Sequence, residues 1–369
     1  MVTLLVAAGA YAGVRQQTHP TGQVSTPSPV AKSPAAIPPP PDRRGTGYHV
    51  WDADMVDERF GAVLASDCDV YAGPTCHYYV ATTADGAQTW SRPVQVGPTF
   101  DAVDGDAPRM IRLINRHDGF VYGHVSAFAT HDGAKTWNSA NLPGVAVADL
   151  TVYEGRVWVA TYPCKKGTLC PFEVRSSTDA GRTWSPAYQL PLNFSPNIVA
   201  FATGAIVFST PPGEIRVTTD RGATWRDIAS PCRADQFRGD APSADGIEIW
   251  VLCRAYPDAA GAITDESLYV SEDAGRNWKR VDMLAALPDW VVSPRPHVAF
   301  ASGKNLMTTV THDSGRTWSR LSRDYFAFVT LRFKSASWGW GWSDAEVAFV
   351  TTDGGESFKP AGTIPGRLA

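Results

Sequence analysis

The sequence of 369 residues lacks the signatures of several large classes of protein. It has no Cys-x-x-Cys pair, no paired histidines at the spacing of zinc ligands, and no stripe of basic residues that would suit nucleic acid. The Gly-x-Ser-x-Gly, phosphate-loop and His-Glu-x-x-His motifs are also missing. These absences argue against a nucleic-acid partner, against a bound metal or cofactor, and against the common hydrolase and nucleotide-binding families.

The first 45 residues differ in composition from the rest of the chain. Residues 1–14 are apolar and uncharged, a run too short to cross a bilayer alone, and we expect the remainder of a signal peptide or membrane anchor there; a disordered apolar stub is the alternative. Residues 15–45 are rich in proline, so we expect an extended, disordered linker that buries no core. Four basic residues and one acidic residue give this region a charge of +3. Because the net charge of the whole chain is −4, residues 46–369 carry a net charge of −7.

One short motif recurs seven times along residues 46–369. It reads Ser or Thr, any residue, Asp, a short gap, and then Thr-Trp or a close variant, as in the stretch from Ser177 to Trp184. A repeat of about 45 residues is typical of stacked four-stranded β units. The central aspartates of the seven copies are Asp85, Asp132, Asp179, Asp220, Asp273, Asp313 and Asp353.

The residue types in the motif suit a tight turn that leads into a strand. An aspartate such as Asp179 can accept hydrogen bonds from nearby backbone N–H groups and close the turn. Gly181 can take the positive φ that such a turn needs, and Trp184 can bury its ring against the neighbouring repeat. Two copies have alanine, Ala87 and Ala134, where glycine is usual, so we expect their turns to differ slightly from the other five.

Each repeat has room for four strands. In the third repeat, β-rich runs at 149–153, 156–162, 172–176 and 184–190 are separated by turn residues, and the seventh repeat shows the same order. The motif falls between the third and fourth runs. We therefore predict an all-β chain in which residues 46–369 form a single seven-bladed β-propeller of four-stranded antiparallel blades.

The motif resembles the Asp-box, or BNR repeat, of sialidases, sortilin-type receptors, family 74 xyloglucanases and photosystem II assembly factors. The resemblance extends from Tyr48 to about Pro365 and rests on seven copies in register. It implies a β-propeller fold and is closest to a single-domain, non-catalytic BNR-repeat protein. It does not select an activity, because those proteins include enzymes, receptors and assembly factors.

The six cysteines lie in three close pairs, and the expected strand order places each pair at the end of a blade opposite to the repeated turn. Neighbouring antiparallel strands are about 5.5 Å apart at Cα, a distance that a disulfide tolerates. Spacing alone does not fix the pairing, and metal binding is the competing use. We expect three disulfides and therefore an oxidising compartment. The expected pairs are Cys68 with Cys76, Cys164 with Cys170, and Cys232 with Cys253.

The face that carries the cysteines also carries the longest insertions between strands. Binding usually resides on loops that a rigid scaffold holds in place, so we expect the ligand on this face. The alternative for each single residue is an ordinary solvated loop position. The candidate binding residues are Tyr71, Tyr162, Arg254, Tyr256 and Trp290.

The sequence holds no complete catalytic set. A sialidase would need three arginines around a carboxylate; Arg112, Arg254 and Arg332 could approach the centre of the ring, but no Tyr–Glu pair accompanies them. We therefore predict a non-catalytic, extracytoplasmic monomer, secreted or anchored by its N-terminus, that binds a protein or a cell-envelope glycan. The alternatives are an exo-glycosidase of sialidase type and an assembly factor for a membrane complex.

Overall fold

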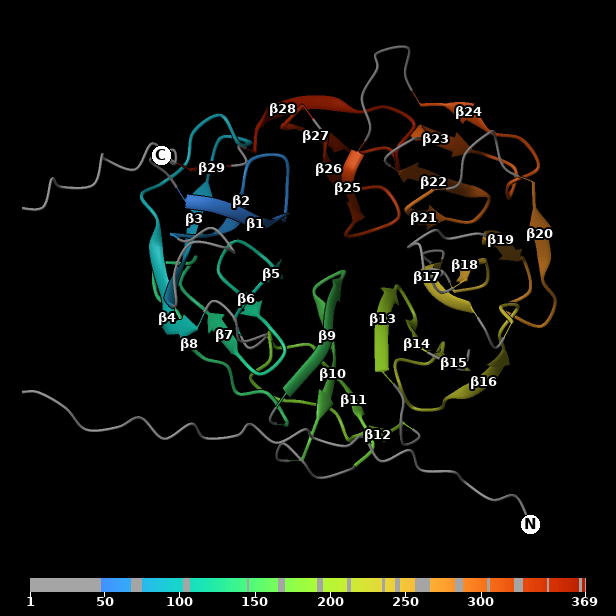
Figure 1. Ribbon diagram of the computed structural model, residues 1–369, viewed down its shortest axis with the longest axis horizontal. Coiled ribbons are helices and arrows are strands. Elements are labelled where there is room, and N and C mark those ends of the chain that lie inside the picture. Colours follow the sequence, from blue (N-terminus) through green and yellow to red (C-terminus); the bar gives the residue numbers. More distant parts are fainter. Residues whose placement is uncertain are drawn as a thin grey trace, which may run out of the picture. The chain divides into compact units, whose positions relative to one another are not determined.

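The computed structural model describes residues 48–369 except 68–74, 102–106, 145, 165–169, 191–194, 211–213, 234–235, 243–245, 256–265, 283–287, 304–305, 322–327, 344, 365–366 and 369. These residues all belong to the unit Thr46–Ala369. They form seven antiparallel sheets arranged as blades around a common centre, which confirms the predicted seven-bladed β-propeller (Figure 1). In the described part of the chain, no helix is long and apolar enough to cross a membrane.

The first four blades follow one another along the chain, and each is a meander of four strands. Blade 1 holds β1 (Tyr48–Met55), β2 (Gly61–Ser66), β3 (Thr75–Thr83) and β4 (Val94–Asp101); blade 2 holds β5 (Met110–Leu113), β6 (Gly119–Tyr122), β7 (Ala127–Thr130) and β8 (Asn138–Ser139). Blade 3 holds β9 (Ala146–Tyr153), β10 (Arg156–Tyr162), β11 (Glu173–Ser177) and β12 (Tyr188–Gln189); blade 4 holds β13 (Ser195–Phe201), β14 (Gly204–Thr210), β15 (Glu214–Thr218) and β16 (Arg226–Ala229).

The last three blades repeat this order, and a short strand follows them. Blade 5 holds β17 (Gln236–Pro242), β18 (Ile249–Ala255), β19 (Glu266–Ser271) and β20 (Lys279–Val281); blade 6 holds β21 (Trp290–Arg295), β22 (Val298–Gly303), β23 (Leu306–Thr311) and β24 (Ser319–Arg320). Blade 7 holds β25 (Phe328–Phe333), β26 (Gly339–Ser343), β27 (Val347–Thr351) and β28 (Lys359–Thr363), and β29 (Arg367–Leu368) pairs with β1.

The seven motif turns connect the third and fourth strands of their blades and share one geometry, which we call the aspartate turn. In blade 3, Asp179 Oδ1 accepts hydrogen bonds from Ser177 Oγ and Thr183 N, both at 2.8 Å, and Asp179 Oδ2 accepts one from Thr183 Oγ1 at 2.6 Å. Every turn has two consecutive residues with positive φ after its aspartate. Ala87 and Ala134 take the same left-handed conformation as the glycines of the other turns, with φ of 67° and 66°. Their turns differ slightly, as expected: the next backbone N–H, that of Gln88 or Lys135, donates to the aspartate Oδ1 at 3.2 or 3.0 Å.

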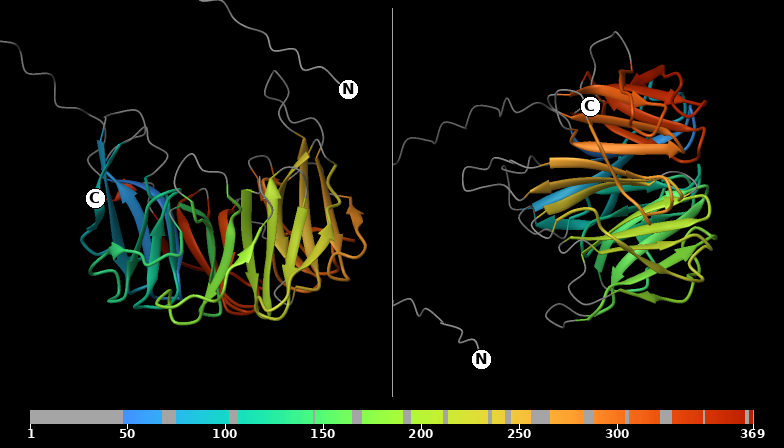
Figure 2. Two further views of the ribbon diagram at one scale, coloured as in Figure 1. Left: turned by 90° about the horizontal axis from the view of Figure 1, so that it is seen from below. Right: turned by 90° about the vertical axis from the view of Figure 1, so that its right-hand side faces the viewer.

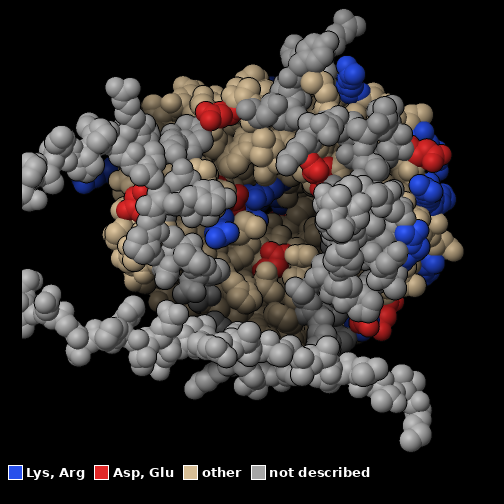
Figure 3. All heavy atoms as spheres, viewed as in Figure 1, with Lys and Arg blue, Asp and Glu red and all other residues tan. Residues whose placement is uncertain are grey.

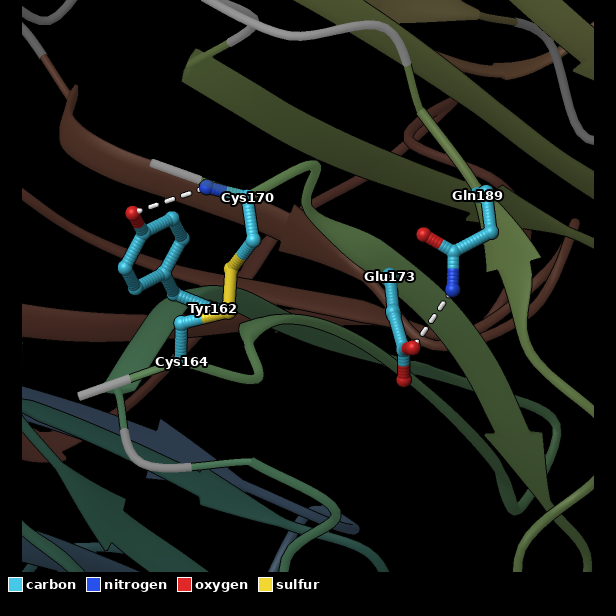
Figure 4. Close-up of a disulfide and its surroundings, with 5 residues drawn as sticks. All are labelled: Tyr162, Cys164, Cys170, Glu173 and Gln189. Carbon is cyan, nitrogen blue, oxygen red and sulfur yellow. Dashed lines mark hydrogen bonds between the residues drawn. A yellow bond between two sulfur atoms is a disulfide. The ribbon is translucent and has the colours of Figure 1, made fainter. Parts of the chain in front are cut away.

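Antiparallel order places the aspartate turns at one end of every blade and the connections between second and third strands at the other end (Figure 2). The disulfides Cys164–Cys170 and Cys232–Cys253 lie at this second end, as expected, so we call it the stapled face. The first joins the end of β10 to the start of β11, where the backbone N–H of Cys170 also donates to Tyr162 Oη at 3.2 Å (Figure 4). Cys76 is also disulfide-bonded, and Cys68 lies outside the described residues.

The hydrophobic core is divided into clusters that lie between neighbouring blades. Each aspartate-turn tryptophan packs against the preceding blade; Trp184, for example, contacts the cluster that includes Phe120 of blade 2 and Val157 of blade 3. Trp340 is fully buried between blades 7 and 1. These contacts hold the inner strands at fixed positions around the centre of the ring.

Candidate functional site

A cavity of about 380 Å³ lies at the centre of the propeller, and we call it the central cup. Its walls are first strands of five blades, which are the innermost strands of the ring. Figure 3 views the stapled face and shows a hollow at the centre with basic and acidic side chains inside it. The lining residues include Arg112 of β5, Asp149 of β9, Val199 of β13, Trp290 of β21, and Val329, Arg332 and Lys334 of blade 7.

The cup has a floor on the side of the aspartate turns. The tight turn at Glu154 and Gly155, both with positive φ, joins β9 to β10. Its Glu154 N–H donates to the carbonyl of Lys334 at 3.0 Å, which is on the opposite side of the ring in blade 7. This hydrogen bond ties blade 3 to blade 7, so the cup is reached from the stapled face.

One wall of the cup is built around Asp52, which is 6% exposed. Arg112 Nη1 donates to Asp52 Oδ2 at 2.7 Å, and Arg332 Nη2 donates to Asp52 Oδ1 at 2.9 Å. The backbone N–H of Ile111 donates to Oδ2 as well, at 3.1 Å. Burial opposes ionisation of Asp52, but the charges of Arg332 and Arg112 outweigh it and hold the pKa of this carboxyl below its usual value.

A third ion pair lies next to the two that Asp52 makes. Lys334 Nζ donates to Asp54 Oδ2 at 2.5 Å and to the carbonyl of Leu113 at 2.9 Å. Trp340 Nε1 donates to the other oxygen of Asp54 at 3.2 Å. Burial lowers the pKa of Lys334, although the neighbouring Asp54 opposes that shift. The three ion pairs together join blades 7, 1 and 2.

Asp149 is the third carboxyl of the cup, and backbone amides hold both of its oxygens. Leu150 N donates to Oδ1 and Ile198 N donates to Oδ2, each at 2.8 Å. The hydroxyl of Tyr122 lies 3.4 Å from Oδ1. Burial raises the pKa of Asp149 above its ordinary value. Asp149 thus links β9 to β13 of the next blade, as Asp52 links β1 to β5.

Much of the rest of the cup wall is apolar. Val329 of β25 is 52% exposed, which is unusual for a valine on an inner strand, and Leu331 and Trp290 lie on the same lining. Val199 belongs to the lining of β13. The cup therefore offers an apolar wall and a wall of guanidinium and carboxylate groups to the same ligand.

The structure places the candidate residues that the sequence analysis named at different parts of the propeller. Trp290 lines the cup, as do Arg112 and Arg332, whereas Tyr162 lies beside the Cys164–Cys170 disulfide. Arg254 belongs to β18, and Tyr71 and Tyr256 lie outside the described residues.

The sequence interpretation missed Asp52, Asp54, Asp149 and Lys334. One signal was present: Asp52 and Asp54 are two residues apart in the first strand of blade 1, while Arg332 and Lys334 are two residues apart where the first strand of blade 7 ends, Lys334 directly after it. Residues two apart share a face of a strand, and these two strands are neighbours once the ring closes.

No family model and no curated protein matches the sequence. Solved structures with a similar fold include YCF48 bound to D1 peptide, 15% identical, with a TM-score of 0.54, where the match covers 87% of this chain and 95% of that one. An ancestral GH74 enzyme is 14% identical with a TM-score of 0.54, and its match covers 87% of this chain but 45% of the enzyme. The designed Ika8 protein is 10% identical with a TM-score of 0.50, and its match covers 87% and 90% of the two chains. Likeness at these identities shows the propeller fold.

Proposed function

We propose that this chain is a non-catalytic binding protein whose central cup receives a segment of a protein partner through the stapled face. The observation that carries the proposal is that the charged side chains of the cup are paired with groups of the protein itself. Among the described residues, every charged side chain that lines the cup already has a partner within the protein, so the wall is a fixed surface for recognition and has no acid or base poised for proton transfer.

The two walls of the cup suit a peptide. Guanidinium N–H groups that remain after the bonds to Asp52 can donate to backbone carbonyls, while Trp290 and Val329 can contact apolar side chains. YCF48, which has a similar fold, is known in a structure bound to a peptide. This supports a protein segment over a glycan as the ligand.

The disulfides support an oxidising, extracytoplasmic location. Residues 1–14 would then act as an export signal or anchor, and residues 15–45 as a spacer between the membrane and the propeller. An assembly factor for a membrane complex would be one form of such a binding protein.

The test is capture of partners from native membranes with the immobilised propeller, followed by mass spectrometry. Val329→Asp places a charge on the apolar wall of the cup and should remove the captured partner. Val125→Asp is the matched control, because Val125 is also exposed, at 43% against 52% for Val329, but lies outside the cup. Equal capture by wild type and Val329→Asp would refute the proposal.

Glycoside hydrolysis is the second candidate. A glycosidase needs one carboxyl with a raised pKa and a second one that stays ionised, and Asp149 and Asp52 show this opposite pair of shifts. However, both oxygens of Asp149 are held by backbone amides, and Asp52 is clamped between two arginines. If the wild type hydrolyses xyloglucan fragments or aryl sialosides and the Asp149→Asn variant does not, glycoside hydrolysis would replace binding as the proposed function.

A further inference from the structure

The two arginines of the cup converge on one point, and Asp52 occupies it. Arg112 approaches one oxygen of the Asp52 carboxylate from blade 2, and Arg332 approaches the other oxygen from blade 7. A carboxylate between two guanidinium groups is the arrangement by which proteins bind carboxylates from outside. Here the carboxylate is supplied by the chain itself.

Asp52 is fixed in this place by its surroundings. Ile111 N donates to the same oxygen that Arg112 contacts, and Arg332 Nη1 donates to the backbone carbonyl of Ala53, next to Asp52 in β1. Asp52 is buried, so it cannot turn away into solvent and vacate the site. An external anion could reach the arginines only by displacing a tethered one.

Among the described residues, the charged groups in and directly behind the cup wall balance in number, while the arginines have more N–H groups than the hydrogen bonds in which they take part. Arg112, Arg332 and Lys334 stand against the carboxyl groups of Asp149 in the lining and of Asp52 and Asp54 behind it. Each guanidinium carries five N–H donors, and the bonds to Asp52 and to backbone carbonyls use only part of them. A ligand that offers acceptors without a net negative charge fits this wall.

We propose that Asp52 is the residue that determines the ligand specificity of the cup. It acts as a built-in counter-anion, so the cup accepts uncharged segments through their carbonyl and amide oxygens and excludes carboxylates and phosphates. The identity of the ligand as a protein segment rests on the proposed function, whereas the exclusion of anions is a property of the propeller alone.

The experiment is a titration of small anions against the purified protein, with thermal unfolding as the readout. Formate, a carboxylate small enough to replace the Asp52 side chain, is compared with chloride at equal ionic strength. The wild-type midpoint should respond equally to the two salts. Asp52→Ala should have a lower midpoint, because two buried cations lose their partner, and formate should recover most of that loss with a saturable dependence that chloride does not match.

Asp118→Ala is the matched control. Asp118 also pairs with an arginine and a histidine, Arg182 and His131, but outside the cup and with both cationic side chains exposed to solvent, so formate and chloride should act on this variant alike. If Asp52→Ala does not fold, Asp52→Ser takes its place in the titration, because the shorter side chain also leaves the position of the carboxylate open to formate.

Two results would overturn the proposal: saturable stabilisation of the wild type by formate, or a response of the Asp52 variant that does not differ from that of Asp118→Ala. The titration needs no partner, so its failure is separate from a failure of partner capture. If partner capture fails but formate still stabilises the Asp52 variant, Asp52 remains the group that excludes anions. Only the proposal that the ligand is a protein segment would then be withdrawn.

Discussion

The repeated tryptophans differ in how their indole N–H groups are satisfied. Those of blades 1, 3 and 5 donate to a backbone carbonyl of the preceding blade, at 2.9 to 3.1 Å. Those of blades 2, 4 and 6 have a buried indole nitrogen without a partner among the described residues. The first set is Trp90, Trp184 and Trp278, and the second set is Trp137, Trp225 and Trp318.

This alternation predicts different costs for the same substitution. Trp184→Phe removes a hydrogen bond to the carbonyl of Asn141, whereas Trp225→Phe removes a buried N–H that has no partner. We expect Trp184→Phe to lower the free energy of unfolding by about 1 kcal/mol more than Trp225→Phe does. Urea unfolding of the two variants checks this, and equal losses would contradict it.

The aspartate turns predict how stability depends on pH. In blade 3, hydrogen bonds from the Thr183 hydroxyl, the Thr183 backbone N–H and the Ser177 hydroxyl lower the pKa of Asp179 to about 2. A folded pKa below the unfolded value means that the turn contributes stability above pH 4 and loses it as the pH falls toward 2. The other six turn aspartates also have a pKa of about 2.

Asp179→Asn should therefore be less stable than the wild type at pH 7, and the difference should shrink as the pH falls toward 2, where about half of the Asp179 carboxyl groups are protonated. Asp149 titrates with the opposite sign: its raised pKa favours the folded state at low pH, and that contribution is lost as the pH rises through the folded pKa. Urea unfolding at several pH values measures the gap between Asp179→Asn and the wild type. A gap that does not change with pH would show that ionisation of Asp179 is irrelevant.

At the scale of the turn and its strands, the atoms packed around a glycine decide how much stability a substitution by alanine costs. A Cβ added at Gly355, where φ is 87°, would lie 2.2 Å from Phe300 Cζ. A Cβ added at Gly155, where φ is 77°, would have nothing within 4 Å. Gly155→Ala should cost about 1 to 2 kcal/mol from backbone strain alone, and Gly355→Ala should add roughly 1 to 3 kcal/mol of overpacking. Chemical denaturation measures the free energy of unfolding of both variants. A similar loss of stability in the two variants would mean that Phe300 moves aside freely.

The two disulfides whose cysteines are both described close loops of different length. Cys232 and Cys253 are 21 residues apart, whereas Cys164 and Cys170 are 6 apart. Because a cross-link stabilises mainly by restricting the unfolded chain, replacing the longer bridge with a serine pair should cost about 3 kcal/mol and the shorter one about 2 kcal/mol. Unfolding of the two double variants under oxidising conditions checks the order, and a larger loss for the shorter bridge would reverse it.

The blades could be predicted from the sequence because their determinants are local. The bonds that close an aspartate turn join Asp179 to residues no more than four positions away, so the motif is visible in one short stretch. The cup could not be predicted in this way, since Asp52 meets Arg112 and Arg332 at separations of 60 and 280 residues. Those contacts depend on where the ring closes, and no spacing within one repeat encodes that.

At the scale of the whole ring, closure depends on contacts between the last blade and the first. The indole of Trp90 donates to the carbonyl of Thr363, Thr363 N donates to the carbonyl of Ala87, and β29 pairs with β1. Ile364, which is 3% exposed, is buried in the cluster between blades 7 and 1. This junction joins the two ends of the repeat array.

Ile364→Ala should therefore lower the free energy of unfolding by about 2 to 5 kcal/mol, because it leaves a cavity at the closing junction. The control is Ile247→Ala, at a side chain that is 52% exposed, which should change stability by about 0.5 kcal/mol or less. Thermal unfolding of both variants measures the difference. A small effect of Ile364→Ala would mean that the junction contributes little to the folded ring.

The hydrogen bond between Glu154 and Lys334 crosses the centre of the propeller on the side of the aspartate turns and obstructs that side. If the cup binds a protein partner as proposed, the partner would insert a chain terminus or a narrow loop from the stapled face and withdraw by the same path. The folded bulk of the partner would then stay outside, above the rim that the cystine bridges reinforce.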